Sequence, residues 1–288
     1  MERLLRYLLL TFSITAVLDL AALSSMGYYP PVARLLLALR IAAPALGVAI
    51  ISLAYFGELS ERLLHPSFAH RYLIHSIILP IVIVSLGSLI TVLINERISL
   101  PSVSLSQLSL SELPSDELVS LMLMVSGFLS GITINALASL IEEIGWRGFM
   151  LEETMRYGFL RSSLVVGLVW GVWRLPIGFL YTKVYPKHSD ALGLLAFLSL
   201  TLVISPILAW LRVRSRSLYP VALFSGVLWS LSNSFAFFLR VEDEILGFPY
   251  GLPLLSSLFV VMLPLLKLGE RGAVVAGRAG SSPKIPSL

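Results

Sequence analysis

The sequence contains no cysteine, which excludes disulfides, thiolate metal sites and a cysteine nucleophile. Charge is also scarce, because Asp, Glu, Lys and Arg make up only 13% of the 288 residues, against about 25% in a soluble domain. The basic residues are spread over several segments and form no cluster typical of a nucleic-acid-binding surface. We therefore expect neither a soluble domain nor a nucleic-acid partner.

The rest of the composition is strongly apolar, with 57% hydrophobic residues and a mean hydropathy of +0.88. These residues gather in runs long enough to cross a bilayer as helices. The runs are Leu4–Leu23, Val32–Phe56, Leu73–Ile94, Leu118–Ile141, Leu164–Tyr181, Ala191–Leu211, Pro220–Leu239 and Leu252–Leu266. They predict an all-α fold, a polytopic membrane helical bundle of about eight transmembrane helices. Such a chain is integral to the cell membrane, with the lipid bilayer as its partner.

The distribution of lysine and arginine predicts the orientation of the bundle. With the N-terminus in the cytoplasm, fourteen basic residues fall on cytoplasmic segments and five on the opposite side. Because cytoplasmic loops carry the excess of Lys and Arg, we predict that both termini are cytoplasmic. The segment around Glu142 then lies on the cytoplasmic side, and a site there is expected to open to that side.

The chain shows neither an internal repeat nor a linker between domains, so we expect one membrane-embedded helical domain over residues 1–268. Residues 269–288 are rich in Gly, Ser, Pro and basic residues, which predicts a disordered cytoplasmic tail. The pattern specifies no oligomeric state.

Two adjacent carboxylates, Glu142 and Glu143, end the fourth apolar run. Charges at such a position are costly unless they are paired or hydrated. Glu143 and Arg147 are four residues apart and can form an ion pair on the helix surface. A helix turns 100° per residue, so Glu142 must point elsewhere, and it is free to face a cavity between helices. The alternative is a solvated helix end with an ordinary salt bridge.

Arg174 lies in the middle of the fifth apolar run, where an arginine costs at least ~2.5 kcal/mol. A carboxylate partner is therefore expected, and Glu142 is the first candidate, because a short loop returns the chain from it into this helix. The alternatives are Asp19, Glu152 or Glu153, or backbone carbonyls in a water-filled cavity. Arg40, in the second run, can instead snorkel to the interface. Pro176 is expected to kink the fifth helix.

Small residues predict where helices pack closely. Gly127 with Gly131, and Gly167 with Gly171, form GxxxG pairs that allow close helix contact. In the seventh run, Ser225, Trp229 and Ser232 share one face by helical spacing. Small polar residues in spans usually form hydrogen bonds across helices or to their own backbone.

The order of these motifs resembles the CPBP family of intramembrane endopeptidases, which includes the type II CAAX prenyl endopeptidases and bacteriocin-processing or immunity proteins. The first motif is Glu-Glu-x-x-x-Arg, from Glu142 to Arg147. The second is Trp-x-x-Trp-x-Leu-Pro, from Trp170 to Pro176, and the third begins at Pro220. The resemblance covers residues 118–240, and the eight-span layout agrees with it.

The resemblance implies peptide-bond hydrolysis, with Glu142 activating a water and an ion pair of Glu143 and Arg147 supporting it. The family has a histidine at position 174, and a histidine and an asparagine at 225 and 229. This chain has Arg174, Ser225 and Trp229 there. The catalytic candidates are Glu142, Glu143, Arg147, Arg174 and Ser225, and we assign no metal and no cofactor.

These replacements change the available chemistry. Arginine stays protonated and has no acceptor, so Arg174 can neither act as a base nor bind a metal cation. It can still stabilise an oxyanion electrostatically. Serine donates a hydrogen bond but does not replace imidazole as a proton shuttle. The four histidines lie on other segments: His65, His70, His75 and His188.

Two interpretations follow. In the first, the chain keeps the bundle and a Glu142–Arg174 pair but has reduced or lost peptidase activity, as a pseudoenzyme. In the second, it is a divergent endopeptidase with an arginine-stabilised oxyanion. We favour the first, because the missing groups carry acid–base catalysis worth about 10²–10⁴-fold in rate. The substrate implied is a membrane-associated or lipid-modified peptide. The alternative class is a non-catalytic membrane scaffold, an immunity-type binding protein or a small transporter.

Overall fold

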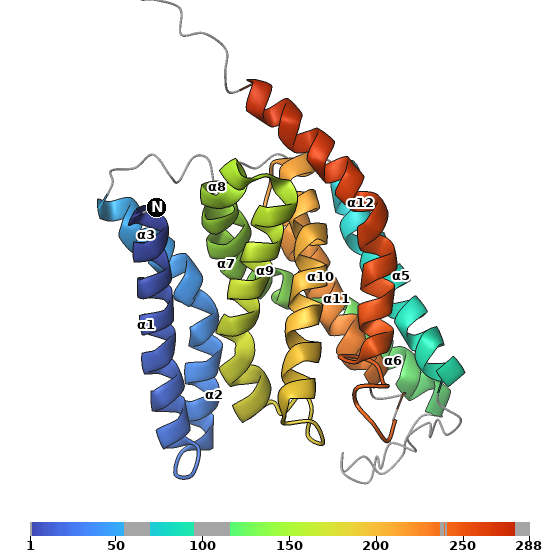
Figure 1. Cartoon of the computed structure of the whole chain (residues 1–288). Helices are drawn as coiled ribbons and strands as arrows, with labels where there is room; N and C mark the ends of the chain where they lie inside the picture. Colours follow the sequence, from blue (N-terminus) through green and yellow to red (C-terminus); the bar gives the residue numbers. More distant parts are fainter. Residues whose placement is uncertain (1, 55–69, 95–115, 237–238, 240, 280–288) are drawn as a thin grey trace, which may run out of the picture.

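The computed structural model describes residues 2–54, 70–94, 116–236, 239 and 241–279, and these residues form helices and connecting turns, without a strand. Eight helical segments cross the molecule in alternating directions (Figure 1). They correspond one by one to the eight predicted apolar runs, so the all-α prediction is confirmed.

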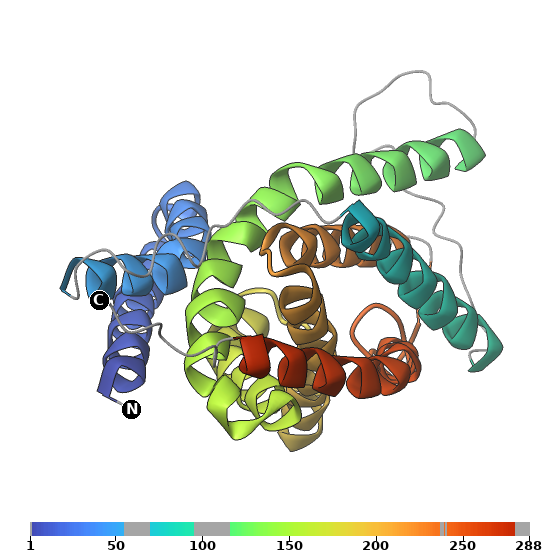
Figure 2. The same ribbon diagram turned by 90° about the horizontal axis from the view of Figure 1, so that it is seen from above.

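The first two segments form a hairpin at one side of the molecule (Figures 1 and 2). Helix α1 (Glu2–Ser25) descends, and α2 (Pro30–Leu39) returns through a short 3-10 turn, η1 (Arg40–Ala42), into α3 (Ala43–Ala54). Pro30 begins α2, where its missing N–H costs no hydrogen bond. The hairpin contacts the remaining helices through α3 and η1 and also through α1, where the Tyr7 ring lies 6.0 Å from that of Trp146.

The central segment carries the acidic motif and is not one continuous α-helix. After α5 (His70–Ile94), α6 (Asp116–Ile132) is followed by α7 (Ile134–Glu143), and the two are separated by Thr133 at φ −118° and ψ −96°. Figure 2 shows α6 turned away from the direction of α7, toward α5. The chain continues in a π-helix, η3 (Ile144–Met150), then in α8 (Leu151–Thr154) and η4 (Met155–Tyr157).

The last four segments complete the bundle. Helix α9 (Phe159–Leu175) runs into a second π-helix, η5 (Pro176–Tyr181), and is followed by α10 (Ala191–Ser215), α11 (Tyr219–Ala236) and α12 (Leu252–Ala279). Pro176 removes one backbone donor at the junction of α9 and η5, which accounts for the change from α to π geometry there. The Asp190 carboxylate caps α10 by accepting from the N–H groups of Leu192 and Gly193.

Six of the helical segments are long and apolar enough to cross a membrane: Glu2–Ser25, Pro30–Leu53, Arg71–Ile94, Leu121–Tyr157, Phe159–Tyr181 and Ala191–Ser215. The chain is therefore a multi-pass integral membrane protein. The last two predicted spans are less apolar or shorter. Helix α11 has 18 residues, including four serines and Asn233, and the apolar part of α12 is Leu252–Leu268.

Glycines bring neighbouring helices into close contact, as the GxxxG pairs predict. A Cβ on Gly131 would lie 2.9 Å from the Cα of Val227 in α11, and one on Gly167 would lie 2.8 Å from the carbonyl oxygen of Thr201 in α10. Gly127 and Gly171 make equally close contacts with the same two helices. These contacts hold α6 and α9 against the helices that form the cavity described below.

Helix α12 continues to Ala279, beyond residue 268, where the predicted membrane domain ends. The first residues predicted as a tail are thus helical in the structure. Residues 280–288 lie outside the described part of the chain, and the division into domain and tail stays a prediction.

Candidate functional site

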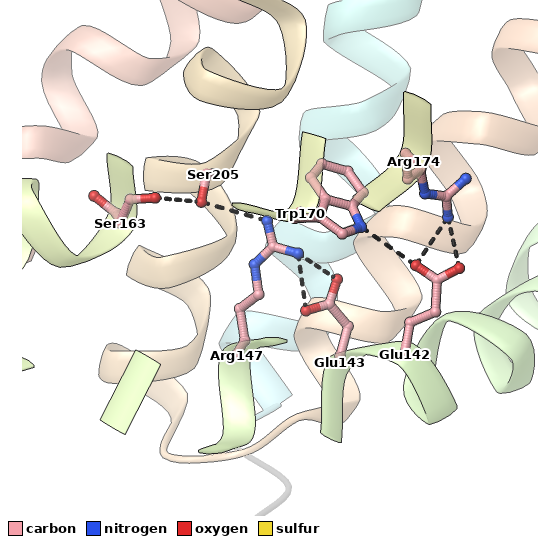
Figure 3. Close-up of polar contacts among 7 residues, drawn as sticks. All are labelled: Glu142, Glu143, Arg147, Ser163, Trp170, Arg174 and Ser205. Carbon is pink, nitrogen blue, oxygen red and sulfur yellow. Dashed lines mark hydrogen bonds and ion pairs between the residues drawn. The ribbon is translucent and has the colours of Figure 1, made fainter. Parts of the chain in front are cut away.

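Glu142 and Arg174 form an ion pair inside the bundle (Figure 3). The Nη2 atom of Arg174 donates to both carboxylate oxygens of Glu142, at 2.7 and 2.8 Å. Glu142 ends α7 and is 6% exposed, whereas Arg174 lies in the last turn of α9 and its side chain is 31% exposed. The predicted pairing of these two residues is confirmed.

Trp170 lies between the Glu142–Arg174 ion pair and a second ion pair, formed by Glu143 and Arg147. Its indole Nε1 donates to Glu142 at 3.4 Å, one α9 turn before Arg174. The guanidinium of Arg147 lies 4.6 Å from the centre of its ring, and that of Arg174 lies 5.4 Å away. Aromatic rings attract cations at such distances, so this tryptophan stabilises both arginines and fixes the position of the Glu142 carboxylate.

Glu143 and Arg147 form the second pair, as their spacing predicts. Arg147 Nη1 donates to the two carboxylate oxygens at 3.0 and 3.2 Å, and neither side chain reaches the surface. Arg147 Nη2 also donates to the hydroxyl of Ser205 at 3.4 Å, and that hydroxyl donates to the carbonyl of Ser163 at 2.6 Å (Figure 3). These hydrogen bonds join η3 to α9 and α10, so the Glu143–Arg147 pair has a structural role.

A third buried pair connects the N-terminal hairpin to α9, and the sequence does not predict it. Arg40 Nε donates to Asp19 at 2.9 Å, Arg40 Nη2 donates to the carbonyl of Trp173, and the guanidinium lies 4.1 Å from the centre of the Trp173 ring. Arg40 is only 2% exposed. The expectation that it snorkels is wrong, because a carboxylate on α1 lies within reach.

This pairing also removes Asp19 as a partner for Arg174. Glu152 is engaged elsewhere as well, since it pairs with Arg212 at 2.6 Å. Asp19 and Arg40 are opposite charges within two neighbouring apolar runs, and this is the signal that points to their pairing.

A cavity of about 690 Å³ begins at the Glu142–Arg174 pair. Helices α7, α9, α10 and α11 form most of its wall, together with η5. Ser225 and Trp229 of α11 both line it, whereas Ser232 does not. Ser225 therefore shares a cavity with Glu142 and Arg174, although no hydrogen bond joins it to either of them in the described structure. Phe197, Trp229 and Tyr250 give the cavity an aromatic wall.

The cavity reaches the end of the bundle opposite the N-terminus. Its lining includes Thr182, Lys183 and Pro186 from the loop after η5, and Pro249 and Tyr250 from the loop before α12 (Figure 1 shows both loops at the lower end). The sequence predicts an opening at the other end. That end is instead filled by η3, whose residues from Gly145 to Met150 are all buried.

Hydrogen bonds hold the two loops at this mouth together. The Tyr185 hydroxyl donates to the carbonyl of Tyr250 at 2.5 Å, and the Tyr250 hydroxyl donates to Asn233 at 3.0 Å. Burial raises the pKa of both tyrosines, so both remain donors at neutral pH. Trp229 stacks on Tyr250, with ring centres 6.1 Å apart.

The described histidines lie away from the cavity lining. His75 packs against Tyr72 and Trp210, and His188 contacts Asp243 at 3.1 Å. His65 and the side chain of His70 lie outside the described part of the chain. Within the described part, no three His, Cys, Asp or Glu side chains are grouped as metal ligands. The donors around Glu142 do not fit a metal ion, because a guanidinium contacts both carboxylate oxygens and its charge repels a cation.

Comparison with known proteins shows that the part of the chain that contains this site is similar to one family. Residues 124–231 match the family described as type II CAAX prenyl endopeptidase Rce1-like. A relative named CAAX prenyl protease 2, from Methanococcus maripaludis, is 28% identical over 110 residues, or 37% of this chain. The match spans 40% of the length of that relative. The matched residues include Glu142, Arg174 and Ser225, and over residues 124–231 the chain matches the Rce1-like type II CAAX prenyl endopeptidase family.

Proposed function

We propose that this chain is a membrane-embedded member of the family whose cavity binds a membrane-associated or lipid-modified peptide and hydrolyses it weakly or not at all. The observation that carries the proposal is the contact of Arg174 with both oxygens of Glu142. A carboxylate held in this way is a poor base for a water molecule, because a permanently charged donor competes for its lone pairs.

The rest of the cavity lacks a group that could replace the missing base. Arg174 has no lone pair to accept a proton, and Ser225 is a neutral hydroxyl. Within the described structure, no histidine lines the cavity. Loss of acid–base catalysis reduces the rate of such reactions by about 10²–10⁴-fold, whereas the aromatic wall and the volume that favour peptide binding are retained.

One observation favours a second candidate, an active but divergent endopeptidase. Figure 3 shows the other terminal nitrogen of Arg174, Nη1, turned away from Glu142, and this nitrogen has no hydrogen bond to a described residue. A cation at this position can stabilise the oxyanion of a tetrahedral intermediate. In that case Glu142 would still have to activate the water.

A cleavage assay with the purified protein and lipid-modified peptides separates the two candidates. We expect little or no turnover by the wild type, and turnover by the Arg174→His/Ser225→His double variant. Arg214→His, at an exposed position near the end of α10, is the control for an added histidine. Turnover by the wild type that is lost in Glu142→Ala would contradict the proposal and support the divergent enzyme.

Peptide binding is measured separately by fluorescence anisotropy with a labelled, lipid-modified peptide. We expect saturable binding that weakens when a bulky residue fills the cavity, as in Ser225→Phe. A polar surface change, Arg161→Gln on the first turn of α9, should leave binding unchanged. Absence of saturable binding by the wild type would contradict the binding function itself.

A further inference from the structure

Two exposed arginines, Arg71 and Arg214, lie at the end of the bundle where α5 begins and α10 ends (Figure 1). Aromatic contacts join the two helices here, since the centre of the Trp210 ring lies 5.8 Å from that of His75 and 5.8 Å from that of Tyr72. Arg71 comes one helical turn before His75, and Arg214 comes one turn after Trp210. Because α5 and α10 run in opposite directions, both arginines lie beyond these rings, toward the same end.

Neither of these arginines pairs with a carboxylate in the described part of the chain. The guanidinium of Arg71 lies 4.9 Å from the centre of the Tyr72 ring, a contact that leaves its charge in place. Arg212, also in the last turns of α10, differs from them, because it is buried and donates to Glu152 at 2.6 Å. Two positive charges therefore remain available to an anion at the junction of α5 and α10.

Ring nitrogens add hydrogen-bond donors to this junction. The Nδ1 atom of His75 donates to the carbonyl of Arg71, which holds the exposed imidazole beside that arginine. The Nε1 atom of Trp210 is buried and has no acceptor in the described structure. Buried donors without a partner are rare, and an acceptor oxygen that enters beside His75 would satisfy this one.

The surface of α5 next to this junction is apolar and faces outward. Arg71, Ile74, His75 and Ile78 share one face of the helix by their spacing. Ile74 is 55% exposed and Ile78 is 52% exposed, and in a membrane-spanning helix such side chains contact acyl chains. Positive charge at the helix end, followed by an apolar stripe, matches the two parts of a phospholipid, its phosphate and its acyl chain.

We propose that this junction binds the phosphate of an anionic phospholipid through Arg71, His75 and Arg214. The acyl chain lies along Ile74 and Ile78. Arginine is well suited to phosphate, because its planar group donates two parallel hydrogen bonds. In the predicted orientation this end of the bundle lies at the cytoplasmic leaflet, where anionic lipids create a negative surface potential.

The site is separate from the cavity, since none of these five residues lines it. Helix α5 packs mainly on α11 and α12. A lipid whose phosphate contacts Arg71 and Arg214 would attach α5 to α10 as well, so its binding should stabilise the fold. The inference therefore stands whether or not the cavity binds a peptide.

The test measures lipid binding to the purified full chain in detergent by native mass spectrometry. It compares phosphatidylglycerol with phosphatidylcholine of the same acyl chains. We expect the wild type to bind phosphatidylglycerol at least about fivefold more tightly, and Arg71→Gln and Arg214→Gln each to weaken this binding about fivefold. Arg161→Gln, the same change at an exposed position on the first turn of α9, should retain the preference.

Two further measurements separate a lipid from a soluble anion and recognition from folding. Inorganic phosphate at the concentration of the lipid should not displace phosphatidylglycerol, and Ile74→Gln/Ile78→Gln should weaken its binding. Without added lipid, Arg71→Gln and Arg214→Gln should melt at the temperature of the wild type, because both side chains are exposed. Phosphatidylglycerol should raise the melting temperature of the wild type more than that of either arginine variant.

Equal binding of the two lipids by the wild type would overturn this inference. An equal loss in Arg161→Gln would also overturn it, because the preference would then come from the overall positive charge of this end. Displacement of the lipid by inorganic phosphate would replace the lipid site with a site for a soluble anion. Each of these results would leave the proposed peptide binding untouched.

Discussion

At the scale of single residues, two neighbouring carboxylates have different surroundings. Glu142 and Arg174 meet at the end of a cavity, and part of the arginine side chain is exposed to it. Glu143 and Arg147 are enclosed by protein, and their side chains are 3% and 0% exposed. Only the first pair can exchange contacts with a ligand, and the second can only hold helices together.

A double-mutant cycle tests whether Glu142 and Arg174 are energetically coupled in the folded protein. Glu142→Gln and Arg174→Met should each lower the free energy of unfolding by about 1–3 kcal/mol. This is less than the 3–5 kcal/mol of a fully buried pair, because Arg174 is partly hydrated. The double variant should lose less than the sum of the two, since no charge is then left alone. Denaturation in detergent measures these values, and additive losses would contradict the coupling.

The sequence predicts two contacts of this site correctly. One follows from the spacing of two residues on a helix, and the other from the free-energy cost of an arginine within a span. The four-residue spacing of Glu143 and Arg147 predicts their pair, and the cost of Arg174 within a span predicts a carboxylate partner. The pair of Asp19 and Arg40 is missed because snorkelling explains Arg40 equally well in one dimension. Only the approach of α1 to η1 excludes that explanation.

At the scale of elements, helix α11 forms one wall of the cavity and packs closely against α6 and α7. Gly226 lies at the closest approach, next to Ser225. A Cβ at this position would lie 2.5 Å from the backbone nitrogen of Ala136 and 2.8 Å from its Cα, so neither side can yield without a backbone shift. Helix α11 can therefore lie at its present distance from α7 only with glycine at 226.

Gly226→Ala should thus lower the free energy of unfolding by about 1–3 kcal/mol, the usual range for overpacking, and weaken peptide binding by moving Ser225. Gly27→Ala is the matched control, because a Cβ on Gly27 would meet no atom within 4 Å. Thermal unfolding in detergent and the anisotropy assay report both effects. A Gly226→Ala variant as stable as Gly27→Ala would refute the close contact.

Apolar runs predict the eight helical segments, because length and hydropathy are sufficient to specify spans. They do not predict the interruption at Thr133 or the two π-helices, which change the direction of a helix without changing its composition. Both π-helices begin next to the site, η3 directly after Glu143 and η5 two residues after Arg174. Pro176 is the one local signal, and it predicts a kink but not its geometry.

At the scale of the whole molecule, the N-terminal hairpin lies outside residues 124–231 but contacts the site through Trp173. The charge distribution predicts that the N-terminus lies in the cytoplasm. In that orientation, the loops at the cavity mouth lie on the opposite side of the membrane. Orientation therefore decides which compartment supplies the ligand.

The absence of cysteine allows a direct test by single-cysteine labelling in intact cells. With the predicted orientation, Tyr28→Cys and Lys187→Cys should react with a membrane-impermeant maleimide added outside. Arg161→Cys and Arg214→Cys should react only after the cells are opened. All four residues are exposed in the structure. The reverse pattern would place the N-terminus outside and the cavity mouth in the cytoplasm.

The packed end of the cavity has a consequence for kinetics. Trp146, Arg147 and Phe149 are each at most 1% exposed and fill the bundle beyond Glu142. A compound in the cavity therefore cannot pass through this end of the bundle. While these three side chains stay packed, the protein offers no continuous path for a solute from one compartment to the other. A cavity closed at this end is suited to holding a ligand.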